Sequence, residues 1–180
     1  MQEPEVSLLI AMAYIRDGKT HSDVTVSIDG AHVGAKGTVR FDVIGFMREQ
    51  GYRKCGVEDG RWQGTYENPA FSPRILISSE PGKGDVKILL EDGNVLYIES
   101  KKIRGGKGGE YPAMREAIGQ LMTGCPNDTN MIPVVAVPHT VKSAELAKEW
   151  SQKTRIRMAG IRFMLVREDG EITFTEEAER

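Results

Sequence analysis

The chain has little of several features that would point to a function at once. Its 180 residues include only two cysteines, Cys55 and Cys125, and neither has a Cys or His neighbour at the spacing of a metal site. We therefore expect two free thiols and a reducing compartment. The longest apolar run near the start, Leu8 to Ile15, is too short to span a bilayer, and acidic rather than basic residues precede it. The sequence thus predicts a cytoplasmic protein without a membrane span.

Neither sign of charge dominates. The 24 Lys and Arg against 26 Asp and Glu give a net charge of −2, which offers no electrostatic signature of nucleic-acid binding. The charge is unevenly placed, because the acidic C-terminal segment 168–180 carries −5 and leaves +3 on the rest. An apolar fraction of 39% in 180 residues is enough for one core, so we expect a single domain over residues 1–180.

Two common catalytic signatures are also missing. The glycine-rich stretch from Gly30 to Thr38 lacks the Gly-Lys-Ser/Thr triplet of a phosphate-binding loop. The three histidines are scattered, and the sequence suggests no Ser-His-Asp or Cys-His pairing. Nucleotide-binding loops of that type and hydrolytic triads are therefore not expected.

The hydrophobic periodicity predicts a chain of mixed α/β class. Helices are expected from Pro4 to Gly18, from Val39 to Gly51, from Pro112 to Gly124 and from Thr140 to Lys153. Strands are expected at 23–28, 75–78, 86–90, 95–99, 131–137, 161–166 and 172–174, with strand plus loop over 53–73. This order predicts an α/β fold with a mixed central β-sheet flanked by helices.

The predicted hairpin of residues 86–99 carries chemically useful side chains at one end. Asp85 opens its first strand, and Glu99-Ser100-Lys101 closes its second. Strand side chains alternate between faces, so Glu99 and Lys101 point the same way. Asp85 shares their face only if the paired residue numbers have an even sum, as with Asp85 opposite Lys101. That requires a loop of three or five residues, or a bulge.

Carboxylates beside a lysine suit phosphodiester hydrolysis. Hard carboxylate oxygens bind Mg²⁺, which usually takes one or two protein carboxylates and completes its shell with water and phosphate oxygens. Such a metal lowers the pKa of a bound water and stabilises the leaving oxygen. Lys101 would orient the attacking water or offset charge on the phosphate. The alternative is that Asp85 and Glu99 are surface carboxylates at a solvated strand end.

At this point the residues resemble a family. Asp85, a gap of thirteen residues, Glu99-Ser100-Lys101, then a helix and a buried strand is similar to the PD-(D/E)xK restriction-endonuclease-like nuclease superfamily. The resemblance covers roughly Val39 to Val166 and departs from the motif at Gly84, where the family pattern has Pro. It implies a restriction-endonuclease-like core, with residues 1–36 as an N-terminal helix and strand extension.

The resemblance also implies an activity and its parts. It implies hydrolysis of DNA with Mg²⁺ or Mn²⁺, the metal being held by Asp85 and Glu99 with the Ser100 backbone carbonyl as a further ligand. Lys101 would position the water. Enzymes of this size often need a second subunit to cut both strands, so a homodimer is expected by analogy.

Further residues enter through the same resemblance. Some members place an acid from the preceding helix at the metal, for which Asp42 is the candidate, and several use a glutamine on the following helix, for which Gln120 is the candidate. Surface or capping roles for both stay open. Apart from the resemblance, Lys101, Lys102, Arg104 and Lys107 form a basic cluster across a glycine-rich loop, which suits phosphate contacts or is a solvated loop.

Two other functions stay open at this stage. One is a nucleic-acid-binding or structural module that has a nuclease-like fold and does not cleave. The other is a nuclease directed at RNA. Incubation with metal and nucleic acid distinguishes the module from a nuclease, because the module binds the nucleic acid without cleaving it.

Overall fold

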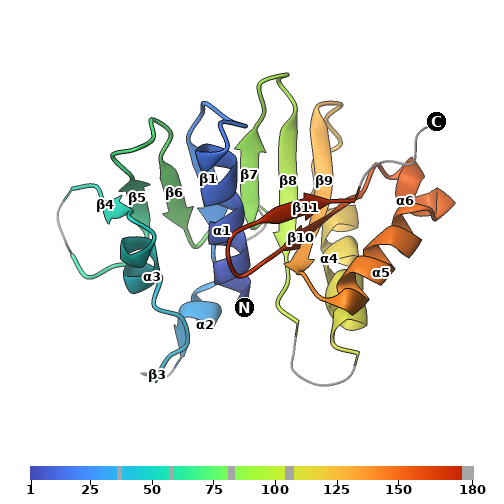
Figure 1. Ribbon diagram of the computed structural model, residues 1–180, viewed down its shortest axis with the longest axis horizontal. Coiled ribbons are helices and arrows are strands. Elements are labelled where there is room, and N and C mark those ends of the chain that lie inside the picture. Colours follow the sequence, from blue (N-terminus) through green and yellow to red (C-terminus); the bar gives the residue numbers. More distant parts are fainter. Residues whose placement is uncertain (36–37, 57–58, 81–83, 104–107, 176–180) are drawn as a thin grey trace.

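A nine-stranded mixed sheet with helices on both faces forms the body of the molecule (Figure 1). This computed structural model describes residues 1–35, 38–56, 59–80, 84–103 and 108–175. The helices within these ranges are α1 (Glu3–Arg16), α2 (Gly30–Val33), α3 (Val43–Glu49), α4 (Glu110–Gly124), α5 (Val141–Ser151) and α6 (Thr154–Met158). The prediction of an α/β fold with a mixed central sheet is confirmed.

The sheet has a spatial order unlike its order along the chain. From one edge to the other it runs β11 (Ile172–Phe174), β10 (Arg162–Val166), β9 (Met131–Pro138), β8 (Val95–Ser100), β7 (Val86–Leu89), β1 (Val24–Ser27), β6 (Ile75–Ser78), β5 (Gly64–Glu67) and β4 (Arg53–Lys54). Two short strands, β2 (Gly34–Ala35) and β3 (Thr38–Val39), pair separately.

Strand direction determines which chain segments meet at the sheet ends. Strand β1 pairs in parallel with β6, and β8 pairs in parallel with β9, whereas β7 runs antiparallel between β1 and β8. The carboxyl ends of β1, β6 and β8 therefore lie at the same end of the sheet. In open α/β sheets ligands bind outside the carboxyl ends of strands.

Helix α1 is a central part of the core and not an extension. Its apolar run from Leu8 to Ile15 has no polar face, and eleven of its fourteen residues, Pro4 and all of 6–15, are buried. The helix packs on the sheet, and the turn between β10 and β11 lies against it, with Arg16 donating to the Gly170 carbonyl at 3.4 Å (Figure 1). Residues 1–36 were expected to form an N-terminal helix and strand extension, and the structure places the side chains of α1 and β1 in the main core cluster.

A second hydrophobic cluster fills the opposite face of the sheet. Buried side chains of α4 and α5, such as Met114 and Trp150, pack against Tyr97, Val135 and Phe163 of the strands. The helices predicted at 112–124 and 140–153 are both present with ends close to the expected ones. These helices cover β8, β9 and β10.

The helix predicted from Val39 begins four residues later. Asp42 caps α3 at Val43, and Val39 instead lies in β3 with 73% of its surface exposed. The apolar spacing of Val39 and Val43 fits a helix, but the cap decides where this helix starts.

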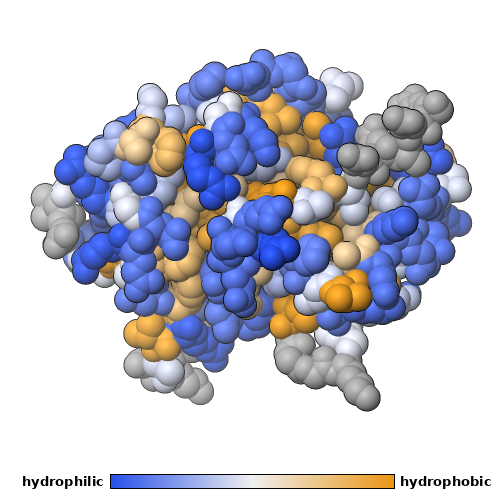
Figure 2. Space-filling model, in the orientation of Figure 1, coloured by the Kyte–Doolittle hydropathy of each residue, from blue (hydrophilic) through white to orange (hydrophobic). Residues whose placement is uncertain are grey.

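The face of the molecule in Figure 2 is mainly hydrophilic, with separate smaller hydrophobic areas. Among the described residues, no helix is long and apolar enough to cross a membrane.

Candidate active site

The hairpin of β7 and β8 brings Asp85 and Glu99 to one face. Val86 pairs with Ile98 and Leu89 with Val95, so the paired numbers have an even sum and the loop between the strands has five residues. Continuing this register by one residue places Asp85 beside Glu99. The even-sum condition is confirmed, although the partner of Asp85 is Glu99 and not Lys101.

Both carboxylates open into a cavity of about 1000 Å³ at the carboxyl ends of β1, β6 and β8. Residues of α4 form one wall, and residues at the carboxyl ends of β1 and β6, such as Ser27 and Ser79, form the other. The cavity is also lined by Glu3, His32, Lys101, Lys102 and Gln120. A recess of this size at this end of the sheet is where a small ligand, or one part of a large one, is expected to bind.

The environment of Asp85 opposes its negative charge. Burial and the nearby Glu99 carboxylate raise the pKa of Asp85 from its ordinary 3.8 to about 8. The Ser100 backbone N–H, which donates to Asp85 Oδ2 at 2.7 Å, and the Lys101 ammonium act in the opposite direction. With both carboxylates ionised, the pair would therefore carry more negative charge than its protein neighbours neutralise.

Glu99 and Lys101 are buried, with only 8% and 6% of their surfaces exposed. Burial raises the pKa of Glu99 against the opposing effect of Lys101. Burial by itself would lower the pKa of Lys101, but the surrounding carboxylates, led by Glu3, raise it overall. Lys101 is therefore an ammonium at neutral pH.

A residue that sequence reasoning missed, Glu3, completes the surroundings of Lys101. Its Oε1 lies 3.5 Å from Lys101 Nζ and 3.3 Å from His32 Nδ1, and Glu116 of α4 lies 3.5 Å from the same ammonium. The first turn of α1 thus reaches the candidate site from the far side of the sheet. The acidic first turn before a long apolar run was visible in the sequence, but nothing there indicated that it lies beside Lys101.

The other predicted residues are distributed as follows. Gln120 lines the cavity from α4, and Lys102 lines it while its Nζ donates to Gln2 Oε1 at 3.5 Å. Arg104 and Lys107 lie outside the described residues.

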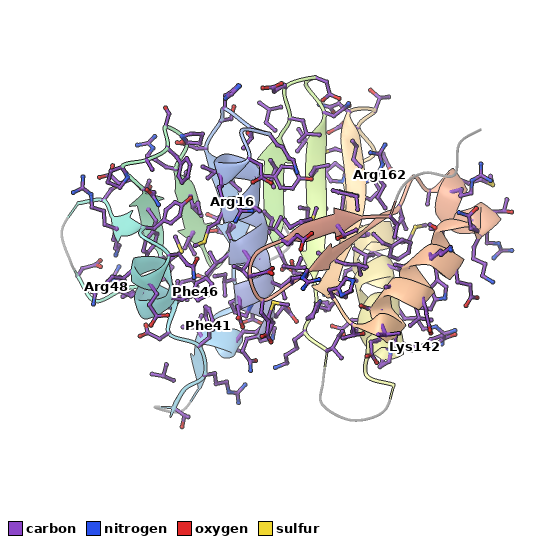
Figure 3. The ribbon with its side chains drawn as sticks, in the orientation of Figure 1. Arg16, Phe41, Phe46, Arg48, Lys142 and Arg162 are labelled. Carbon is purple, nitrogen blue, oxygen red and sulfur yellow. The ribbon has the colours of Figure 1, made fainter. Side chains whose placement is uncertain are left out.

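Asp42 lies elsewhere, as the N-cap of α3. Its Oδ1 accepts a hydrogen bond from the Gly45 backbone N–H at 3.0 Å. Phe41 and Phe46, the residue before the cap and the fourth in the helix, pack with ring centroids 5.3 Å apart in a hydrophobic staple (Figure 3). The expectation of a metal-site role for Asp42 is corrected to a capping role, because its oxygen satisfies a helix N–H and it is not among the residues that line the cavity.

Gly84, the departure from the family pattern, has a specific structural reason. Its φ is +71°, and a Cβ there would lie 2.7 Å from Cζ of the Tyr97 ring. Proline, with φ fixed near −65°, does not fit this backbone. The glycine lets the chain turn over Tyr97 immediately before Asp85.

The donor set fits a divalent cation with a partly aqueous shell. Within the described ranges no group of three or more His, Cys, Asp or Glu side chains is placed to hold a metal ion. Asp85 and Glu99 supply two incompletely neutralised carboxylates, and Mg²⁺ is commonly bound by one or two carboxylates with water and substrate oxygens. The pair suits Mg²⁺ or Mn²⁺ better than a closed tetrahedral zinc site.

Comparisons with known proteins add no assignment. Neither family models, nor curated proteins, nor solved structures yield a match to this chain.

Proposed function

We propose that this protein is a metal-dependent nuclease of the PD-(D/E)xK type that hydrolyses phosphodiester bonds in DNA with Mg²⁺ or Mn²⁺. The observation that carries the proposal is the shared face of Asp85, Glu99 and Lys101 in one cavity. Support also comes from the order of elements after Lys101, because α4 and the buried strand β9, parallel to β8, follow as the resemblance implies. A cytoplasmic location and a homodimer belong to the same proposal.

Each residue has a distinct role. Asp85 and Glu99 would hold the cation, with the Ser100 carbonyl as a further ligand. When bound there, a divalent cation would supply Lewis-acid chemistry toward the phosphate and the attacking water. Lys101, which is protonated, donates hydrogen bonds to the water or phosphate and offsets the charge that develops on phosphorus-bound oxygens. Gln120 contacts the substrate from α4.

The raised pKa of Asp85 bears on metal dependence. Near neutral pH a large fraction of Asp85 carries a proton in the metal-free protein, because its pKa is about 8. A cation must displace that proton, so metal affinity rises with pH. Cleavage that is faster at pH 8 than at pH 6 is the expected consequence.

The test is cleavage of supercoiled plasmid and of matched DNA and RNA oligonucleotides with Mg²⁺ or Mn²⁺. Lys101→Ala, Glu99→Gln and Asp85→Asn should each lower the rate by about 100-fold or more. The controls are Lys142→Ala and Glu145→Gln, which remove the same charges from an exposed ion pair on α5. Thermal unfolding of every variant shows whether the fold is retained.

The outcomes separate the functions. Cleavage that persists in both Lys101→Ala and Glu99→Gln contradicts the proposed site. Binding without cleavage under either metal supports the non-cleaving module, and cleavage of RNA alone supports the RNA-directed nuclease. EDTA should abolish cleavage, and excess Mg²⁺ should restore it.

A further inference from the structure

Part of one sheet face lies open beside the candidate site. On the side that α4 and α5 cover over β8 to β10, Thr25, Ser78 and Lys87 of β1, β6 and β7 are partly exposed and Leu76 of β6 is 37% exposed, whereas Ser27 of β1 is buried. Strands β1 and β6 are parallel neighbours in the interior of the sheet. Interior parallel strands are normally covered on both faces, so we expect this exposed face to bind another molecule.

A first row of side chains leads onto this face from the catalytic pair. Ser27 of β1 donates its backbone N–H to the Asp85 carbonyl at 2.8 Å and pairs with Ser78 of β6. The two serine hydroxyl oxygens lie 3.4 Å apart. Glu99, Asp85, Ser27 and Ser78 therefore follow one another across four adjacent strands, and the first three of them line the cavity.

A second row lies beside the first on the same face. The strand register aligns Thr65, Leu76, Thr25, Lys87 and Tyr97 across β5, β6, β1, β7 and β8. The Lys87 ammonium lies 5.1 Å from the Tyr97 ring centroid, and within the described ranges it forms no ion pair. The row holds hydroxyls, one ammonium and apolar groups, and it contains no carboxylate.

We infer that this open sheet face, formed by Thr25, Leu76, Ser78 and Lys87, binds one strand of the substrate nucleic acid as it leaves the catalytic pair. The inference rests on the proposed function and adds the path of the substrate. Three strand spacings separate Glu99 from Ser78, about 14 Å, so the rows are long enough to follow several nucleotides of backbone.

The chemistry of the rows favours nucleic acid over a second copy of the chain. Hydroxyls and an ammonium are the side-chain groups that contact phosphates and sugars. The core of a protein dimer interface is apolar, whereas this face combines the exposed Leu76 and Leu89 with the polar side chains of Thr25, Ser78 and Lys87. The face is also continuous with the carboxylates at which the scissile phosphate would sit.

The test places a negative charge in the middle of the open sheet face. Thr25→Glu should raise KM for a DNA oligonucleotide about tenfold and leave kcat within twofold, because the added carboxylate repels phosphates without touching Asp85 or Glu99. The matched control is Thr173→Glu, the same change at an exposed position on β11 at the other edge of the sheet. Lys87→Ala should lower the slope of log affinity against log salt by about one, as for one lost phosphate contact.

The results distinguish failure of this inference from failure of the proposed function. If the unaltered protein neither binds nor cleaves nucleic acid, both fail. If it cleaves, and Thr25→Glu and Lys87→Ala keep its KM and salt slope while remaining folded, the inference alone is overturned. A fall in kcat with unchanged KM overturns it too, since the face would then support the site without binding. Light scattering that shows a dimer converted to monomer by Thr25→Glu assigns the face to a second copy.

Discussion

The backbone N–H of Ser100 donates to the side chain of Asp85 at 2.7 Å. This hydrogen bond ties the carboxylate at the start of β7 to the strand that carries Glu99 and Lys101. It holds one oxygen of Asp85, and Glu99 lines the same cavity. A substitution of Asp85 should therefore also shift the backbone that carries Glu99 and Lys101.

The raised pKa values of Asp85 and Glu99 predict a loss of stability with rising pH in the metal-free protein. Because the folded pKa of Asp85 is about 8 and the ordinary value is 3.8, the unfolded chain releases this proton first. The contribution to the free energy of unfolding is fully present below about pH 4 and is lost as pH rises to 8. Other carboxylates with lowered pKa, such as Asp17 and Asp23, titrate below this window.

Urea unfolding at pH 5 and pH 8 measures this loss. We expect the free energy of unfolding to fall by at least ~1 kcal/mol between them, or about 2–4 °C in Tm for a chain of this size. Asp85→Asn should remove most of the difference, and exposed Asp128→Asn should not. If the free energy of unfolding falls with pH equally in the unaltered protein and in Asp85→Asn, the pKa of Asp85 is not raised in the folded state.

Divalent cations should reverse that loss at pH 8. For a site with Kd of about 1 mM, 10 mM Mg²⁺ stabilises the folded state by ~1.4 kcal/mol through mass action. Differential scanning calorimetry with and without Mg²⁺ measures it, with K⁺ at equal ionic strength as the control. If Mg²⁺ raises the Tm of the double variant Asp85→Asn/Glu99→Gln as much as that of the unaltered protein, the metal binds elsewhere.

Glu3 is expected to position Lys101. Glu3→Gln removes the carboxylate that contributes most to the raised pKa of Lys101, so the pKa of Lys101 should fall and cleavage should slow by about tenfold. Nitrogen NMR titration of the Lys101 amine reports the pKa independently of activity. Glu5→Gln is the matched control, because Glu5 lies on the same turn and caps Gln2, a contact that glutamine can keep. Equal effects of the two changes would indicate a general effect of charge on α1.

Gly84→Ala should destabilise the protein more than an ordinary turn substitution. The added Cβ meets the Tyr97 ring at 2.7 Å, and relief requires movement of the backbone next to Asp85. We expect a cost of roughly 2–4 kcal/mol, the sum of left-handed backbone strain and overpacking. Gly93→Ala is the control, because it has a similar φ of +83° and nothing within 4 Å. If both substitutions cost the same in urea unfolding, the Tyr97 contact is not responsible.

The local patterns in the sequence were sufficient for the elements and for the main candidate pair. Strand alternation puts Glu99 and Lys101 on one face. Asp85 joins them when the paired residue numbers of the hairpin have an even sum, and this condition can be stated from the sequence. Both depend on strand geometry that holds over a few residues, so a hairpin can be read without the rest of the fold.

Contacts between distant segments were decided by the tertiary structure alone. Glu3 lies beside Lys101 because α1 packs along the sheet with its first turn at the carboxyl end of β8, and no local pattern records that placement. Asp42 was considered for the metal site and is a helix cap, because an acidic residue that caps a helix cannot be told from a site residue by local sequence alone. Periodicity fixes which face of an element is buried, whereas packing of the whole core fixes which ends of elements meet.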